Sequence, residues 1–153
     1  MKKVLFYLFE DAANSNAVSG QLTPEEIYAC QKAIEAWKNK VRVLIACQSQ
    51  TQAEKIDEYL WQLNTEDFVP HNLAGEGPKG GAPVEICWPQ KRGSGARQLL
   101  INLQDDIPDF AAFFSDVIDF VPSPEQQKNL ARERYKSYKN LGFNLKTIPV
   151  VKS

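Results

Sequence analysis

The 153 residues suffice for one ordinary domain with its own core, and their hydrophobic (43%) and charged (24%) shares are typical of soluble globular proteins. The sequence has 18 lysines and arginines and 19 acidic residues, so the net charge is -1 and the protein is not basic overall. Any surface that binds nucleic acid or an acidic peptide must therefore be a local one. No run of about 18 apolar residues is present and residues 1–10 lack the cleavage site of a secretion signal, so we expect a cytoplasmic protein without membrane contact.

The first half of the chain alternates between strand and helix patterns. Residues 4–9 form a continuous apolar run of strand length, and residues 11–22 are small and polar, as expected for a loop. Thr23, Pro24 and Glu26 then make a capping box with proline at the first helical position, which predicts the start of a helix. Four apolar residues at helical spacing predict its buried face: Ile27, Cys30, Ile34 and Trp37.

A second strand and a second helix follow. Residues 41–47 are apolar and predict the strand, and after a polar turn a helix carries four apolar residues on one face: Ala53, Ile56, Leu60 and Leu63. This alternation predicts a three-layer α/β/α fold with a mainly parallel, Rossmann-like central sheet, in a single domain spanning residues 1–153.

Two aromatic residues near the end of the second helix stand apart from the core pattern. Trp61 lies off the apolar stripe that contains Ile56 and Leu60, and Phe68 follows the helix. An exposed aromatic pair indicates a protein partner. A pair that covers the loop from Asn64 to Asp67 fits the sequence equally well.

A glycine-rich block packs four glycines and two prolines into residues 75–83. Gly75, Gly77 and Gly80 spell GxGxxG, a pattern found in dinucleotide-binding turns. Such a turn opens a helix whose N-terminus holds phosphate, whereas here the apolar residues 84–88 predict a strand. The block is therefore interpreted as a structural loop, and no cofactor is expected.

The chain carries one histidine and three cysteines. His71 has no nucleophile motif beside it, which favours a histidine hydrogen-bonded within a turn at residues 70–72. Cys30, Cys47 and Cys87 are odd in number, far apart and embedded in apolar segments, so their spacing fits neither disulfides nor a zinc site. They are predicted to be buried thiols, and we expect neither a metal site nor catalytic residues.

The second half repeats the strand pattern. Residues 99–103 and 117–121 predict strands, residues 109–115 a short helix between them, and residues 91–97 a basic turn that is exposed to solvent. Five aspartates between Asp105 and Asp119 match neither a calcium loop nor a catalytic carboxylate pair. Helix caps and strand ends account for most of them.

The last helix has two distinct faces. Ser123 and Pro124 predict its start, and Gly142 its end. Leu130, Ala131, Tyr138 and Leu141 gather on one side, whereas a basic strip lies on another: Lys128, Arg132, Tyr135, Lys136 and Lys139. The strip fits an acidic partner and a merely solvated face equally well.

Five segments of the sequence are distinctive: residues 43–47, 71–92, 119–122, 130–136 and 142–145. They closely resemble the chi subunit family of bacterial DNA polymerase III. The resemblance spans nearly the whole chain and is weakest in residues 11–22 and at the C-terminal end. It implies a chi-like fold and a protein that is not an enzyme.

The resemblance also implies partners and their sites. A chi subunit joins the clamp loader through the psi subunit and docks the acidic, aromatic-ended C-terminal tail of single-stranded-DNA-binding protein, so it meets DNA only indirectly. The positions that match the tail-binding residues are Lys128, Arg132, Tyr135, Lys136 and Val121. Those that match the psi-facing surface are Trp61 and Phe68, and whether a helicase shares that surface stays open.

Two other function classes remain as alternatives. A nucleotide-binding α/β enzyme would use the GxGxxG-like loop, and ATP, NAD or flavin would then raise its melting temperature. A direct binder of single-stranded nucleic acid would use the basic strip together with residues 91–97, and its affinity would fall steeply with salt.

Overall fold

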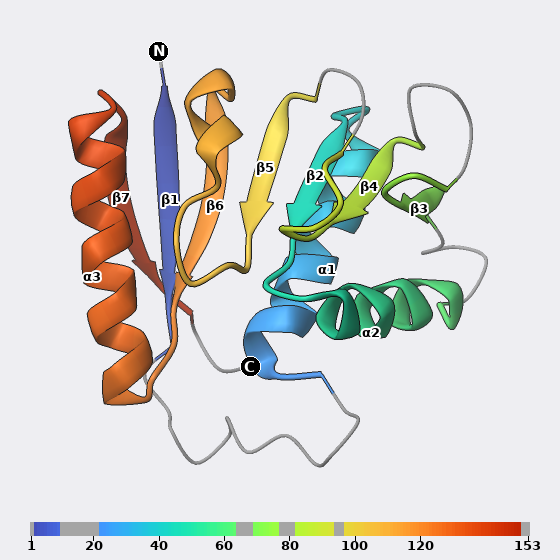
Figure 1. The fold of residues 1–153 in the computed structure, drawn as a ribbon, viewed down its shortest axis with the longest axis horizontal. Coiled ribbons are helices and arrows are strands. Elements are labelled where there is room, and N and C mark those ends of the chain that lie inside the picture. The colour runs from blue at the N-terminus through green and yellow to red at the C-terminus, as the bar shows by residue number, and fades with distance from the viewer. Residues whose placement is uncertain (1, 10–21, 64–68, 77–81, 94–96, 151–153) are drawn as a thin grey trace.

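The structure is a computed structural model that describes residues 2–9, 22–63, 69–76, 82–93 and 97–150. Its described strands form one seven-stranded sheet in the order β3-β4-β2-β5-β6-β1-β7, and every neighbouring pair is parallel (Figure 1). In chain order the elements are β1 (Lys3–Leu8), α1 (Pro24–Lys38), β2 (Val43–Ala46), α2 (Gln50–Trp61), β3 (His71–Leu73), β4 (Val84–Cys87), β5 (Leu99–Asn102), the 3-10 helix η2 (Asp109–Phe113), β6 (Asp116–Val121), α3 (Glu125–Asn140) and β7 (Asn144–Pro149).

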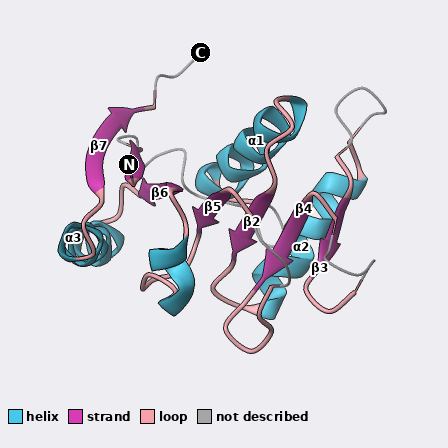
Figure 2. Ribbon diagram, turned by 90° about the horizontal axis from the view of Figure 1, so that it is seen from above, coloured by secondary structure: helices cyan, strands magenta, loops and turns pink. Residues whose placement is uncertain are grey.

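The helices cover both faces of the sheet, as predicted. Ala33 of α1 and Ile56 of α2 pack with Val43 and Ile45 in one apolar cluster. Tyr138 of α3 and Phe110 and Ala111 of η2 pack with the side chains that leave the strands on the opposite face. Figure 2 shows α3 and α1 on opposite sides of the sheet. The three-layer α/β/α prediction is therefore confirmed.

Small residues set how closely α1 approaches the sheet. The capping box is present: the Glu26 amide donates to Thr23 Oγ1 (3.2 Å), and the Thr23 amide donates to Glu26 Oε1 (2.8 Å). Ala29, Cys30 and Ala33 are fully buried. The other residues of the predicted face, Ile27, Ile34 and Trp37, are only half-buried, because the short side chains bring the helix axis close to the sheet and leave the large ones at its flanks.

The three cysteines are free and buried. Burial raises the pKa of the Cys30 and Cys87 thiols to about 12, and it also raises the pKa of Cys47. They therefore act as small apolar side chains, which agrees with the prediction.

A buried polar network joins α3 to the sheet. Arg134 Nε donates to both oxygens of Asp119 in β6 (3.1 and 3.2 Å), and Arg134 Nη2 donates to the carbonyl of Phe120 (2.9 Å). Asn102 Nδ2 (3.1 Å) and the Tyr138 hydroxyl (2.8 Å) also donate to Asp119. Burial raises the pKa of the Asp119 carboxyl, while Arg134 and the other donors oppose that rise. The network fixes α3, and hence everything on its outer face, to β5 and β6.

Several predictions in the second half were wrong. Residues 109–115 form only the five-residue 3-10 helix η2. Pro124, not Ser123, is the N-cap of α3, and no side chain caps that end. Leu141, expected on the packing face, is exposed because it lies at the C-cap, beyond the part of α3 that covers the sheet. Strand β7 was not predicted.

Candidate functional site

A pocket of about 460 Å³ opens between α3 and the carboxyl-terminal halves of β1, β6 and β7. It gathers all five residues that were predicted to bind an acidic tail. Its lining residues are Phe6, Leu8, Val121, Lys128, Ala131, Arg132, Tyr135, Lys136 and Thr147. The consecutive elements β6, α3 and β7 thus combine with β1, from the other end of the chain, to form one site.

The floor of this pocket is apolar. Leu8 and Val121 are register partners at the ends of β1 and β6, so their side chains lie next to each other. The ring of Tyr135 lies 5.6 Å from that of buried Phe6, at an interplanar angle of 42°. The space stays open because Ala131, at the centre of the helix face, has a short side chain. An apolar or aromatic side chain fits this floor.

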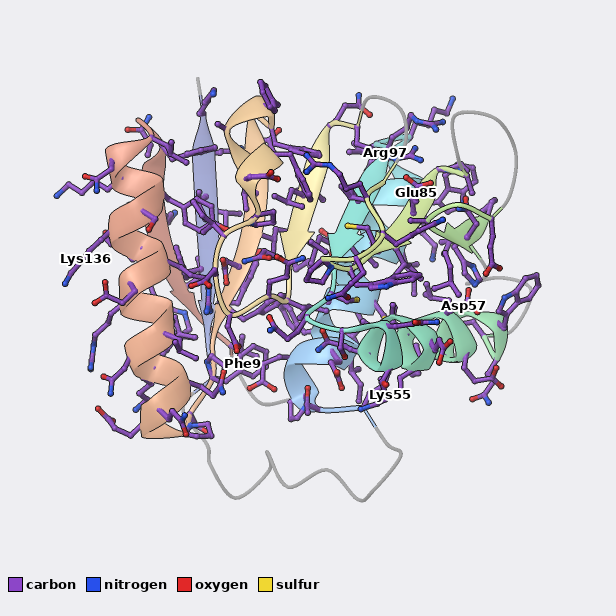
Figure 3. The ribbon with its side chains drawn as sticks, in the orientation of Figure 1. Phe9, Lys55, Asp57, Glu85, Arg97 and Lys136 are labelled. Carbon is purple, nitrogen blue, oxygen red and sulfur yellow. The ribbon has the colours of Figure 1, made fainter. Side chains whose placement is uncertain are left out.

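The rim of the pocket is cationic. Arg132 Nη1 donates to Asn129 Oδ1 (2.7 Å) and lies 3.6 Å from Glu125 Oε1. Lys136 Nζ lies 3.5 Å from Glu133 Oε1 and projects away from the sheet (Figure 3). All of these charged side chains are well exposed, so the ion pairs contribute little, about 0–1 kcal/mol each. A ligand carboxylate can therefore replace the acidic partners at small cost.

A second candidate surface surrounds Trp61 at the end of α2. The indole is 59% exposed, which favours the first of the two interpretations that its place off the apolar stripe left open. Its ring meets the ring of His71 edge to face, with centroids 5.0 Å apart. Phe68, the predicted companion of Trp61, lies outside the described residues.

His71 supports this surface from below. It lies in β3, not in the predicted turn, with Nδ1 2.8 Å from the Val69 carbonyl and Nε2 3.3 Å from Asp57 Oδ1. Burial raises the pKa of the Asp57 carboxyl, while His71 and a hydrogen bond from Trp61 oppose that rise. The histidine side chain is fully buried, so it positions the exposed indole and is not itself a surface residue.

The two surfaces lie at opposite edges of the sheet. Trp61 contacts His71 of β3, at one end of the strand order, and the pocket is lined in part by β7, at the other. Figure 1 shows β3 and β7 at opposite edges of the sheet. The two surfaces therefore share no residue or strand.

The described part of the glycine-rich block behaves as a structural loop. Gly75 has a φ of 86°, a backbone conformation that favours glycine, and a Cβ there would displace the end of the Lys91 side chain. Gly77 and Gly80 lie outside the described residues. After them the chain passes through Pro83 directly into β4, as predicted, so no helix N-terminus follows to bind a phosphate.

The basic turn is less exposed than predicted. Arg97 turns inward, with Nη2 3.5 Å from Glu85 Oε1, and both side chains are only 1% exposed (Figure 3). Arg92 stays at the surface, 3.1 Å from Asp109 Oδ2. The charges of these two arginines are compensated by neighbouring carboxylates, which leaves this turn a weak match for phosphates.

A polar cleft of about 310 Å³ lies at the carboxyl ends of β5 and β6, where open α/β sheets often bind ligands. Three of its charged groups already have partners: Glu26 accepts from the Thr23 amide and from Gln52 Nε2, and Arg134 is paired with Asp119. Among the described residues, no group of three or more histidines, cysteines or acids could hold a metal. Every described helix is too short or too polar to span a bilayer.

Comparison with known proteins points to one family. The family described as "DNA polymerase III chi subunit, HolC" matches residues 1–146. The DNA polymerase III subunit chi of Escherichia coli is 52% identical over 147 residues, which cover 96% of this chain and 97% of the relative. The subunit of Haemophilus influenzae is 51% identical over 126 residues (82% and 87%), and that of Pseudomonas aeruginosa is 31% identical over 145 residues (95% and 94%).

Proposed function

Because the chain belongs to the DNA polymerase III chi subunit family, we propose that it links the clamp loader, through a psi subunit, to the acidic C-terminal tail of single-stranded-DNA-binding protein. As a family member it is an accessory, non-catalytic subunit of the replicative polymerase complex. The proposal rests above all on one observation: Val121, Lys128, Arg132, Tyr135 and Lys136 line a single pocket.

The chemistry of the pocket matches such a tail. The apolar floor of Phe6, Leu8 and Val121 receives the terminal aromatic ring. Arg132 binds the terminal carboxylate through two parallel hydrogen bonds, because a guanidinium presents its donors in the same geometry as the two oxygens. Lys128 and Lys136 balance the remaining acidic side chains as point charges.

The Trp61 surface is the proposed site for psi. A large aromatic side chain that is exposed yet held in place by His71 is typical of the residues that dominate interface energetics. Because this surface and the pocket lie at opposite edges of the sheet, psi and the tail can occupy the protein at the same time. A helicase that used the Trp61 surface would compete with psi but not with the tail.

Titration with a fluorescent peptide tests the tail site. An acidic peptide that ends in an aromatic residue should bind with a Kd on the order of micromolar at modest salt, more weakly as salt rises. A scrambled peptide of the same composition, with its aromatic residue moved away from the C-terminus, should bind more weakly because the apolar floor is left unfilled. Equal affinity for the two peptides would contradict the assignment. Tight binding of an oligonucleotide in place of either peptide would favour a direct nucleic-acid binder.

A further inference from the structure

Strand β7 borders the pocket and leaves one of its edges open. It is the last strand in the sheet order, with β1 as its neighbour, and Figure 2 shows no described element beyond it. Four of its six residues are exposed. An open strand edge of this kind is a template on which an extended peptide can pair.

The register shows which backbone groups face outward. The Asn144 amide donates to the Lys2 carbonyl and the Val150 amide to the Leu8 carbonyl, both at 2.9 Å. The even-numbered residues of β7 therefore direct their backbone groups toward β1. Because backbone groups alternate along a strand, the amide and carbonyl groups of Leu145 and Thr147 point away from the sheet.

Pro149 falls in the same outward register. Its missing amide therefore removes no hydrogen bond from the ladder between β1 and β7, and proline is tolerated at such edge positions. Leu145 and Thr147 are left as the two outward amide donors of β7. The open edge is consequently short and suits a peptide segment of a few residues.

This edge is continuous with the tail pocket. Thr147 lines the pocket, and Leu145 packs in the cluster beneath α3, so the odd-numbered side chains face α3. An added strand would direct alternate side chains toward the cations of α3, Arg132 and Lys136, and the others toward the side of β7 that carries exposed Lys146. Both faces of such a strand would thus meet positive charge.

From these features we propose that the segment preceding the end of the acidic tail pairs with β7 as an eighth strand, through hydrogen bonds to the backbone of Leu145 and Thr147. The inference rests on the proposed function, since the pocket must first hold the end of the tail. Main-chain pairing adds affinity without demanding a fixed sequence, and the acidic side chains supply the charge match.

Two peptides separate this inference from the function on which it rests. The short peptide contains the last four residues of an acidic, aromatic-ended tail, and the long peptide adds six acidic or polar residues upstream. Both should bind the protein, the long one about tenfold more tightly. Two N-methylated versions of the long peptide keep its charge and block alternate upstream amides. One version should bind like the short peptide and the other should keep most of the gain, because alternate amides face β7.

Thr147→Pro and Thr147→Val form a matched pair on the protein side. Both lose the hydroxyl group, but only the proline loses the outward amide, so only Thr147→Pro should abolish the preference for the long peptide. The N-methylated peptides decide the matter on the unmodified protein even where Thr147→Pro fails to fold. If both methylation patterns weaken binding of the long peptide equally, or if neither weakens it, the proposal of an eighth strand is wrong. Failure of both unmodified peptides to bind the parent protein would overturn the tail site, and the eighth strand with it.

Discussion

Arg134 and Asp119 form an ion pair between α3 and β6 that is closed off from solvent, with Arg134 Nε within 3.2 Å of both carboxylate oxygens. Two residues earlier on the same helix, Arg132 projects into solvent at the rim of the pocket. Neighbouring arginines of one helix therefore have different tasks: one holds the helix on the sheet, and the other is available to a ligand.

Arg134→Ala should lower the free energy of unfolding by about 3–5 kcal/mol, because it leaves the Asp119 charge buried without its partner. Arg132→Ala is the matched control and should change that free energy by no more than about 0.5 kcal/mol. Urea denaturation of both variants measures the difference. A loss below about 1 kcal/mol for Arg134→Ala would contradict the structural role given to the pair.

Arg132→Ala should weaken binding of the acidic peptide by about 1.5–3 kcal/mol, because it removes charge-assisted hydrogen bonds to the terminal carboxylate. Lys128→Ala and Lys136→Ala should cost less, since each removes only a point charge. Arg92→Ala is the matched control: its side chain is also 64% exposed and pairs with a carboxylate, but it lies away from the pocket. Fluorescence titration should find the parent affinity for Arg92→Ala. The parent affinity for Arg132→Ala would exclude Arg132 as the residue that binds the terminal carboxylate.

Trp61→Ala, alone or with Phe68→Ala, should abolish co-purification with psi, since an aromatic hot spot contributes about 2 kcal/mol or more to an interface. Phe113→Ala serves as the control, because Phe113 is 87% exposed but lies on η2, away from α2. Its complex with psi should survive. Full retention of psi by a folded Trp61→Ala, Phe68→Ala double variant would exclude this surface from the interface.

Stability should fall as pH rises from about 9 to 12. A thiol whose pKa is near 12 in the folded protein keeps its proton there, whereas in the unfolded chain it loses that proton at about pH 8.5–9, so rising pH favours unfolding. Each such thiol contributes up to about 1.4 kcal/mol per pH unit. Cys87→Ala should therefore flatten the decline relative to the parent. Parallel curves from chemical denaturation at a series of pH values would contradict this.

Local signals in the sequence were enough to predict much of the fold. The capping box at Thr23 and Glu26 marked the start of α1, and the apolar runs located the inner strands within one or two residues. The off-stripe position of Trp61 left two interpretations open, and its 59% exposure favours a surface residue. These signals can be recognised in the sequence because each depends on neighbours within a few residues along the chain.

The missed features depend on distant partners. Strand β7 has only two half-buried residues, Leu145 and Ile148, because it lies at the edge of the sheet, so its apolar pattern is weak. Arg97 was predicted to lie in an exposed turn, and no role was predicted for Arg134. Nothing near either arginine in the sequence shows the acid that pairs with it. One clue was present: Asp119 stands between apolar Ile118 and Phe120, and a buried acid requires a donor.

For the candidate site, the residues on α3 could be predicted from the sequence, but the pocket that they line could not. The helical spacing grouped Lys128, Arg132, Tyr135 and Lys136 on one face. Phe6, Leu8 and Thr147, which complete the pocket, could not be found without the order of the strands.

The opposite placement of the two surfaces has a mechanical consequence. A pull between them would run across the strands, and at β7 it would load the hydrogen bonds to β1 one after another, the direction in which a sheet peels most readily. The side-chain tie from Arg134 to Asp119 connects α3 directly to β6 and so offers the tension a route around the last two strands. Tension on a tail held by α3 can therefore reach β6 without passing through the pairing of β7 with β1.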